Sequence, residues 1–376
     1  MTGSLEEGRG PLADLRVIDC ATVVAGPGAA KYLADFGADV IKVERPGGDT
    51  TREMGWADSR DGVSLWWKLL GRGKRTVVLD LKTDGDVGAM RRLCADADVL
   101  IENFRPGTLE RLGLAPDDLL AANPKLVILR VTGFGQDGPY ANRPGFATMA
   151  EAMSGFASLN GEPDGAPLLP PIALTDEVTA LVGAFAIMVA LHSGVGQVVD
   201  VNLLESLFQL MGPLASAYAV NGYEQPRLGS GIAYTVPRGT YETSDGRWVA
   251  VSTSAESVAA RVMDMLGVGD DERFTTFAGR VAHRDELEAL MASWVAARTE
   301  SEVLAAFEAA QAAIAPVLSM ADIAVDPHYA ARGTIVDVDG TPMQGLVARL
   351  SRTPGRIRWT GRPLGADQDD VLGERS

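Results

Sequence analysis

Histidine and cysteine are scarce in this chain of 376 residues. It contains three histidines and two cysteines, and none of them stand at the short spacings typical of metal ligands. We therefore expect no zinc or di-iron site. Cys20 and Cys94 lie in apolar segments without a Cys-x-x-Cys pair. This predicts two buried free thiols and excludes a fold held by disulfides.

Long hydrophobic runs are also absent. The longest, residues 178–191, is rich in alanine and too short to span a bilayer. The first ten residues are polar and acidic, without the apolar core of a signal peptide. The sequence therefore predicts a cytoplasmic protein. Its share of hydrophobic residues, 46%, is that of ordinary soluble domains.

Lysine is absent beyond the first third of the chain. The formal net charge is −16, which argues against nucleic acid or an anionic membrane as a partner. Residues 1–150 hold 19 basic and 21 acidic residues, whereas the rest holds 15 and 29, and every lysine lies at or before Lys125. This asymmetry indicates either an anionic ligand held by the first part of the chain or simple compositional drift.

Short β-rich runs alternate with helical stretches over the first 150 residues. Such alternation is typical of a parallel sheet covered by helices. Ligands of these sheets usually lie at the carboxyl ends of the strands. A further helix and strand extend the pattern to about residue 220. The predicted strands are residues 15–20, 40–44, 76–81, 99–102, 126–131 and 198–203, and the predicted helices include residues 29–36, 86–95 and 177–192.

The pattern changes near residue 221. Residues 240–251 predict a β-hairpin, because two β-rich segments flank an Asp-Gly turn at Asp245 and Gly246. Three predicted helices follow, and the whole indicates α/β architecture, with a Rossmann-like parallel sheet in a large domain and a smaller α+β domain. The predicted bounds are residues 11–220 for the large domain, completed by residues 330–376, and residues 225–325 for the small domain.

The segment AGPGAA, residues 25–30, matches a dinucleotide-binding fingerprint only in part. Gly26 and Gly28 match its first two glycines, but five residues separate Gly26 from the preceding strand. Pro27 also removes an amide donor from the place where a phosphate would need one. The motif is therefore weak evidence for NAD. We interpret Glu44, which ends the second strand where an NAD ribose ligand would stand, as structural.

Eight basic residues stand near the ends of predicted strands. Cations at neighbouring strand ends suit a ligand with several phosphate groups. A solvated surface with salt bridges explains the same spacing. The eight are Lys42, Arg45, Arg72, Lys74, Arg75, Lys82, Arg105 and Arg111.

Asp176 stands at the start of a nearly all-apolar predicted helix. The usual role of Thr175 or Asp176 at such a position is to cap the helix. The alternative is a functional carboxylate held at the positive end of the helix. The local pattern by itself favours the cap.

Six long segments follow one another along most of the chain: AGPGAAKYLADFGADVIKVERPGGDTTR, GKRTVVLDLK, DVLIENFRPGTLERLG, VTGFGQDGPYANRPGF, AEAMSGFASLNGEPDG and LTDEVTALVGAFAIMVALHSGVGQVVDVNLLES. Together with the later AIAPVLSMADIAVDPHYAARG, they make the chain resemble the family III CoA-transferases, the group that contains formyl-CoA transferase and carnitine CoA-transferase. The resemblance implies a Rossmann-like large domain, a small domain and a homodimer of two interlocked rings.

The resemblance also implies substrates and a site. The substrates would be an acyl-CoA and a small carboxylic acid, with coenzyme A as a substrate and no permanently bound cofactor. By position, the family's nucleophilic aspartate falls on Asp176. The implied CoA contacts are Val24, Ala25, Arg45, Leu79, Lys82, Asn103, Phe104, Arg105 and Arg111, with Phe146 and Ala147 lining the site.

The implied chemistry suits a chain with few histidines. A carboxylate attacks the thioester to give a mixed anhydride, and the returning thiolate gives an aspartyl-CoA thioester. An acceptor carboxylate then reverses these steps, so that neither a metal nor a base acting on carbon is needed.

The chain departs from the family's pattern in three places. Val24 replaces a glutamine that is often found there, and the glycine-rich lid is reduced to Leu228-Gly229-Ser230-Gly231. Gly145-Phe146-Ala147 replaces the Gly-His-Asp of related 2-methylacyl-CoA racemases, which disfavours racemisation because the base is missing. The alternatives to CoA transfer are an acyl-CoA isomerase or racemase on the same fold, and a non-catalytic CoA-binding subunit that pairs with a catalytic homologue.

Overall fold

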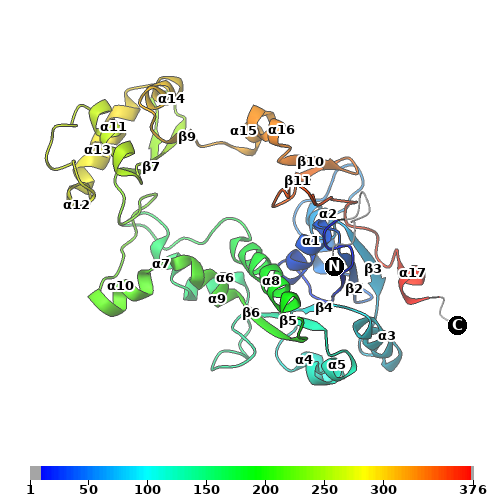
Figure 1. The fold of residues 1–376 in the computed structure, drawn as a ribbon. Helices are drawn as coiled ribbons and strands as arrows, with labels where there is room; N and C mark the ends of the chain where they lie inside the picture. The colour runs from blue at the N-terminus through cyan, green and yellow to red at the C-terminus, as the bar shows by residue number, and fades with distance from the viewer. Residues whose placement is uncertain (1–9, 374–376) are drawn as a thin grey trace. The chain divides into compact units, whose positions relative to one another are not determined.

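The computed structural model describes residues 10–373, and their contacts group the chain into two compact units (Figure 1). The large unit comprises Met1–Gly155, Pro170–Gly212 and His328–Ser376, and the small unit comprises Phe156–Leu169 and Pro213–Pro327.

A six-stranded parallel sheet forms the centre of the large unit. Its strand order is β3-β2-β1-β4-β5-β6, and every neighbouring pair is parallel. The predicted α/β fold with a parallel sheet is confirmed. The order reverses between β1 and β4, which is the switch point where such sheets bind ligands. The strands are β1 (Arg16–Asp19), β2 (Asp39–Glu44), β3 (Lys74–Val78), β4 (Val99–Glu102), β5 (Val127–Thr132) and β6 (Gln197–Asn202).

Helices cover both faces of this sheet (Figure 1). Side chains alternate along each strand, so that Val17 of β1 joins the core under α1 and α8, whereas Ile18 joins the core under α3 and α5. The helices of the large unit are α1 (Ala25–Asp35), η1 (Thr50–Arg52), α2 (Leu65–Leu70), α3 (Asp84–Ala95), α4 (Thr108–Arg111), α5 (Pro116–Ala122), α6 (Ala147–Met153), α8 (Leu174–Ser193), α9 (Leu203–Phe208), η2 (Gln209–Met211) and α17 (Gln368–Leu372), and α16 (Pro327–Arg332) lies at the boundary between the units.

Helix α1 begins at Ala25, four residues earlier than predicted. Pro27 is the third residue of α1. An N–H group at this position has no hydrogen-bond acceptor within the helix, so proline, which lacks the N–H, loses no helical bond. Close packing explains why position 26 is a glycine, since an added Cβ atom would lie 2.3 Å from the Cβ of Ala21. The glycines and the proline therefore start a buried helix directly after β1.

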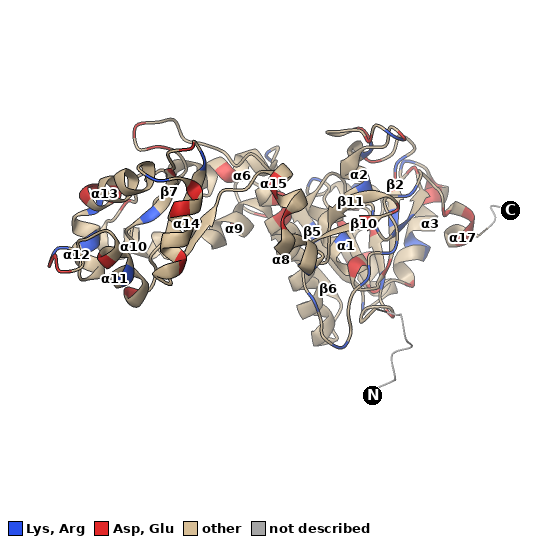
Figure 2. Ribbon diagram, turned by 90° about the horizontal axis from the view of Figure 1, so that it is seen from above, with Lys and Arg blue, Asp and Glu red and all other residues tan. Residues whose placement is uncertain are grey.

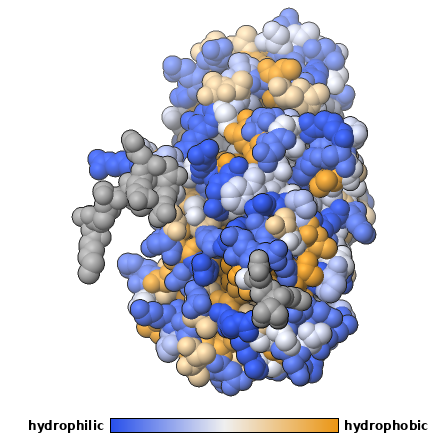
Figure 3. Space-filling view, turned by 90° about the vertical axis from the view of Figure 1, so that its right-hand side faces the viewer, coloured by the Kyte–Doolittle hydropathy of each residue, from blue (hydrophilic) through white to orange (hydrophobic). Residues whose placement is uncertain are grey.

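The C-terminal segment covers the edge strand β3. Asp367 Oδ2 accepts from the N–H of Thr76 at 2.8 Å, and Gln368 bonds both main-chain groups of Val78, at 2.7 and 3.1 Å. These side chains replace a neighbouring strand and so protect the edge from pairing with other chains. Figure 3 views this side of the protein, which is mainly hydrophilic with small apolar groups. Before this segment, β10 (Ile335–Val338) and β11 (Thr341–Gln344) form an antiparallel pair.

The small unit contains a three-stranded antiparallel sheet, β7-β8-β9. The predicted hairpin is confirmed as β7 and β8, and β9 is a third strand that the sequence analysis missed. The apolar sides of its helices bury Phe274 and Phe307 against this sheet. The elements are α7 (Phe156–Leu159), α10 (Leu214–Asn221), β7 (Arg238–Glu242), β8 (Trp248–Ser252), α11 (Glu256–Met265), α12 (Phe277–Ala282), α13 (Arg284–Ala296), α14 (Glu300–Ala309), β9 (Ile314–Pro316) and α15 (Met320–Val325).

Helix α8 is longer than the apolar run from which it was predicted. It has 20 residues and is, within residues 10–373, the one helix long and apolar enough to cross a membrane. An apolar helix in the core of a folded protein meets the same criteria of length and hydropathy. In this structure 33% of the most apolar stretch of α8 is buried.

Both cysteines are buried and free, as predicted. Burial raises the pKa of Cys94 to about 12, which keeps this thiol protonated and unreactive. Among the described residues, no group of three or more His, Cys, Asp or Glu side chains is arranged to hold a metal ion.

Candidate active site

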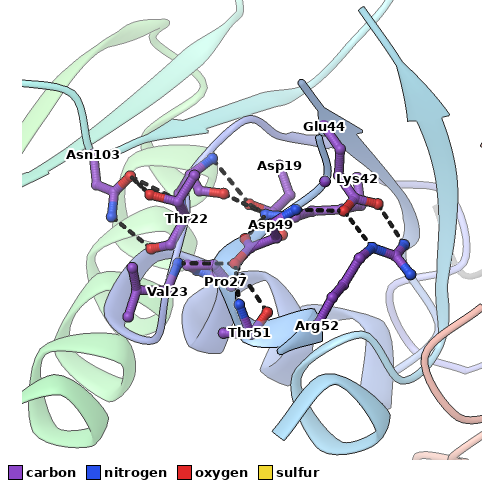
Figure 4. Close-up of polar contacts among 12 residues, drawn as sticks. Asp19, Thr22, Val23, Pro27, Lys42, Glu44, Asp49, Thr51, Arg52 and Asn103 are labelled. Atoms are coloured by element: carbon purple, nitrogen blue, oxygen red, sulfur yellow. Dashed lines mark hydrogen bonds and ion pairs between the residues drawn. The ribbon is translucent and has the colours of Figure 1, made fainter. Parts of the chain in front are cut away.

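The loops after β1 and β4 are hydrogen-bonded to each other at the carboxyl edge of the sheet (Figure 4). The N–H of Thr22 donates to Asn103 Oδ1 at 2.8 Å, and Asn103 Nδ2 donates to the Thr22 carbonyl at 2.7 Å. Strands β1 and β4 are neighbours, but α1 and α4 lie on opposite faces of the sheet. The pair therefore joins the two sides of the switch point.

Two lysines and two aspartates form a buried cluster next to the first of these loops. Lys74 Nζ lies 2.7 Å from Asp19 Oδ2 and donates to the Pro27 carbonyl. Lys42 Nζ lies 3.0 Å from Asp49 Oδ2 and 3.7 Å from Asp19 Oδ1 (Figure 4). Burial lowers the pKa of Lys74 to about 8. Burial alone would also lower the pKa of Lys42, but the carboxylates of Asp19 and Asp49 outweigh it and raise that pKa.

The eight basic residues near the strand ends divide into two groups. Ion pairs with aspartates involve Lys42, Arg72, Lys74 and Arg75. The expected salt bridges are confirmed for these four, but Lys42, Arg72 and Lys74 are buried, so the solvated surface expected for them is wrong. The exposed group consists of Arg45, Lys82, Arg105 and Arg111. Figure 2 shows basic and acidic residues interspersed around β2 and α3. Among residues 10–373, no acidic side chain forms an ion pair with the exposed four, which leaves their charges available to an anion.

The predicted CoA contacts follow strands that end at this same edge. Val24, Ala25 and Leu79 are at most 5% exposed, so these three residues lie beneath the surface at this edge. Phe104 is half-buried and packs against the core under α3 and α5, whereas Phe146 is 67% exposed and precedes α6. By strand, the predicted contacts are Val24 and Ala25 after β1, Arg45 after β2, Leu79 and Lys82 after β3, Asn103, Phe104, Arg105 and Arg111 after β4, and Phe146 and Ala147 after β5.

Glu44 is not free to bind a ribose. Its side chain is fully buried and pairs with Arg52 at 2.7 Å through both carboxylate oxygens, and Glu44 Oε2 also accepts from the N–H of Asp49. The structural interpretation of Glu44 is confirmed (Figure 4).

Asp176 is the third residue of α8 and does not cap the helix. The N-cap residue Ala173 has no side-chain capping bond, and Thr175 Oγ1 donates to Glu151 Oε1 of α6 at 2.9 Å instead. The expected cap is therefore wrong. Within residues 10–373 no donor or cation pairs with the partly buried Asp176. Burial, followed by the charges of Glu151 and Glu177, raises its pKa from 3.8 to about 6.

The neighbouring carboxylate of Glu177 has partners on α1. Tyr32 Oη donates to Glu177 Oε2 at 2.7 Å, and Lys31 Nζ lies 3.7 Å from the same oxygen. Burial lowers the pKa of Lys31 in spite of this carboxylate. Helix α1 thus holds Glu177 and leaves Asp176 as the unpaired acid of the first turn.

Three polar residues that hold the site were not predicted from the sequence. Asp49 follows two glycines and accepts from Thr51 N and Oγ1, which is a typical signal for a side chain that binds nearby backbone. Glu151 is the one charged residue of α6 and is 5% exposed, so a lone charge in an apolar helix was its signal. Thr22 had no signal, because it is bonded mainly through its main chain.

The large unit is a doubly wound α/β fold whose polar loops meet at the switch point of the sheet. A family model described as CoA-transferase family III matches residues 12–368. The chain belongs to this family, and the predicted enzyme class is confirmed.

Relatives match over nearly the whole chain. It is 37% identical to succinyl-CoA–D-citramalate CoA-transferase of Chloroflexus aurantiacus, over 96% of this chain and 93% of that protein. It is 40% identical to the beta subunit of succinyl-CoA–L-malate CoA-transferase of the same organism, over 97% and 94% of the two chains. The crystal structure of a CaiB/BaiF family protein from Brucella suis is 33% identical, with a TM-score of 0.85 over 97% of this chain and 99% of that chain.

Proposed function

We propose that this chain transfers coenzyme A between an acyl-CoA and a carboxylic acid through a covalent intermediate on Asp176. The observation that carries the proposal is the carboxylate of Asp176 itself. It is partly buried and unpaired within residues 10–373, and its pKa is raised to about 6. An unpaired, partly buried acid costs stability, and such groups cluster at functional sites.

The reaction begins with the ionised Asp176. One of its oxygens attacks the thioester carbonyl, the C–S bond breaks, and CoA leaves as a thiolate, which gives a mixed anhydride. The thiolate then attacks the Asp176 carbonyl carbon, which releases the donor acid and gives an aspartyl-CoA thioester. The acceptor carboxylate attacks this thioester, and the same two steps run in reverse. The raised pKa of Asp176 makes its carboxylate a stronger nucleophile.

A backbone amide supplies charge stabilisation for these steps. The N–H group of Asp176 lies in the first turn of α8, where the helix offers no acceptor. We assign it to the oxyanions of the tetrahedral intermediates. Phe146 and Ala147 stand where related racemases carry the His and Asp of their Gly-His-Asp motif. Because the base is missing, we do not expect proton exchange at the α-carbon.

The exposed cations supply the binding of the CoA phosphates. Arg45, Lys82 and Arg105 follow the carboxyl ends of β2, β3 and β4. In the sheet β2 and β3 are neighbours, whereas β1 lies between β2 and β4. Arg111, the last residue of α4, donates from Nη2 to Thr108 Oγ1 at 2.8 Å. These exposed cations suit a ligand with several phosphate charges.

The test is to trap the intermediate. The chain is incubated with succinyl-CoA, the donor named for the relatives, then treated with hydroxylamine, and the modified residue is mapped by mass spectrometry. We expect a hydroxamate on Asp176 and a loss of transfer by roughly a thousand-fold or more in Asp176→Asn. Glu177→Gln, which changes the next carboxylate, is the matched control and should keep both label and turnover.

Four outcomes would contradict the proposal. Label on another residue, or transfer that survives in Asp176→Asn, would exclude the aspartyl route. Deuterium exchange at the α-carbon of a 2-methylacyl-CoA without any acceptor acid would favour the racemase. Failure of the purified chain to transfer CoA to any acid of a broad panel, while it binds CoA, would favour a non-catalytic subunit.

We also propose that two copies associate as interlocked rings. Helix α8 exposes Phe185 and Val189, which are 71% and 53% exposed in the single chain. In the small unit, Val220 of α10 is 80% exposed. Apolar surface of this kind usually marks a protein interface. Light scattering on the purified chain should show a dimer; a monomer that assembles only with a homologue would favour a heteromer. The cytoplasmic location and the absence of a permanent cofactor stay predictions.

A further inference from the structure

Val23 has a backbone conformation that its side chain disfavours. Its φ is +66°, in the left-handed region where β-branched residues are rare because their side chain crowds the backbone. It lies between Thr22 and Val24, directly before α1. Strain of this kind persists only where the surroundings enforce it, and it concentrates at functional sites.

Two side chains from other loops enforce this turn (Figure 4). Asn103 uses its carboxamide oxygen and nitrogen on the N–H and the carbonyl of Thr22, at 2.8 and 2.7 Å. Asp49 Oδ1 accepts from the N–H of Val23 at 3.4 Å. Asp49 is in turn held by Lys42, whose Nζ lies 3.0 Å from its other oxygen. The strained turn is thus clamped from the β4 side and from the β2 side.

The clamp decides where the next residues lie. Val24 is the N-cap of α1 and has no side-chain capping bond. Val24 and Ala25 are buried as whole residues, whereas Thr22 is exposed and Val23 is partly exposed, so a ligand at this edge meets the turn at Thr22 and Val23. A change of φ at Val23 would reorient Thr22 relative to the buried start of α1, because a rotation at one residue moves the chain on one side of it relative to the other.

We propose that Asn103 is a positioning residue, which holds Val23 in its left-handed conformation so that the exposed turn at Thr22 and Val23 meets coenzyme A. The inference rests on the proposed function, and it refines the prediction that Asn103 contacts CoA itself. The geometry supports it, since the oxygen and the nitrogen of the Asn103 carboxamide are both hydrogen-bonded to Thr22.

Glycine at position 23 provides the test, because glycine adopts positive φ without strain. Asn103→Ala should raise the KM for the acyl-CoA donor about ten-fold, since two hydrogen bonds to the turn are lost. The double variant Val23→Gly/Asn103→Ala should return to within roughly three-fold of the parent. The kcat of both variants should change less than KM does.

A matched control separates positioning from general loosening. Asn123 also bonds main-chain groups, with Nδ2 donating to the carbonyls of Cys94 and Ala97 at 3.0 and 2.7 Å, but it lies away from the strained turn in the sequence. Asn123→Ala should lower the thermal midpoint without raising the donor KM, and adding Val23→Gly should not restore its stability.

The outcomes distinguish the two proposals. If the parent protein neither binds nor transfers CoA, the proposed function fails; hydrogen exchange then decides the positioning role, since Asn103→Ala should speed exchange in residues 22–26. If the parent is active, an unchanged donor KM in Asn103→Ala overturns the inference. A raised KM that Val23→Gly does not rescue also overturns it and indicates direct contact with CoA.

Discussion

Gly28 of α1 and Ala180 of α8 touch so closely that no side chain fits between them. A Cβ atom placed on Gly28 would lie 2.8 Å from the Cβ of Ala180. Val24, the N-cap of α1, lies one helical turn before Gly28, and Asp176 lies one turn before Ala180. This contact therefore sets the distance between the start of α1 and the candidate nucleophile.

Gly28→Ala should push the two helices apart. We expect a loss of roughly 1–3 kcal/mol in the free energy of unfolding, because the added methyl group has no space. We also expect kcat to fall by about ten-fold or more, since small misplacements of reacting groups slow a reaction strongly. Urea unfolding and steady-state kinetics measure the two effects. Gly85→Ala in α3 is the control: its added Cβ meets no atom within 4 Å, and it should be neutral or stabilising.

The rate of CoA transfer should fall as the pH drops through about 6, because Asp176, whose pKa is about 6, must be ionised to attack. The charged or titratable groups that face it are Glu151 on α6 and Glu177 on α8, the latter paired with Lys31 and Tyr32 of α1. Glu151→Gln keeps an acceptor for Thr175 but removes a negative charge. It should move the acid limb of kcat to lower pH by roughly half a unit to one unit.

The pH profile of Glu177→Gln is the comparison for this prediction. Its charge is the weaker of the two influences on the pKa of Asp176, so its shift should be smaller. An acid limb that stays in place in Glu151→Gln would show that another group titrates.

Asp176→Asn should make the inactive protein more stable at neutral pH. The folded state raises the pKa of Asp176 from 3.8 to about 6, so the folded protein holds this proton more tightly than the unfolded chain. The stability that the protonated Asp176 contributes is therefore lost as the pH rises from about 4 to about 6. The variant should gain roughly 1–3 kcal/mol over the parent at pH 7, and nothing near pH 4. Urea unfolding at both pH values, at one protein concentration, checks the sign. An equal gain at both would indicate a different cause.

Lys74→Met should destabilise the protein strongly although the residue binds no substrate in our proposal. The substitution leaves the buried Asp19 carboxylate with Lys42 as its remaining cation, 3.7 Å away, and removes the donor to the Pro27 carbonyl. We expect the free energy of unfolding to fall by about 3 kcal/mol, which is typical when one partner of a buried ion pair is removed. Lys125→Met, at an exposed site, should change stability by less than about 0.5 kcal/mol. The double variant Asp19→Asn/Lys74→Met should lose less free energy of unfolding than the sum of the losses in the two single variants. A loss equal to that sum would show that the pair does not interact.

Much of the fold could be predicted because its signals are local. Alternating β-rich and helical runs indicated the parallel sheet, and the Asp-Gly turn indicated the hairpin of β7 and β8. The start of α1 could not be predicted well, because Gly26, Pro27 and Gly28 usually mark a loop. Their conformation depends on contacts with Ala21 and Ala180, which local propensity does not contain. Strand β9 was missed for the same reason, since three residues form a strand only beside β8.

The sequence by itself determined the family, the α/β class and Asp176 as the candidate nucleophile, because long ordered motifs carry that information. It left open whether Asp176 caps its helix and which basic residues are available to a ligand. Only the tertiary structure decided these points. Asp19 and Lys74 are 55 positions apart, and their pairing depends on strand order and register. The burial of Lys42 and Lys74, the exposure of Arg45 and Arg105, and the hydrogen bonds between Thr22 and Asn103 follow from that long-range arrangement.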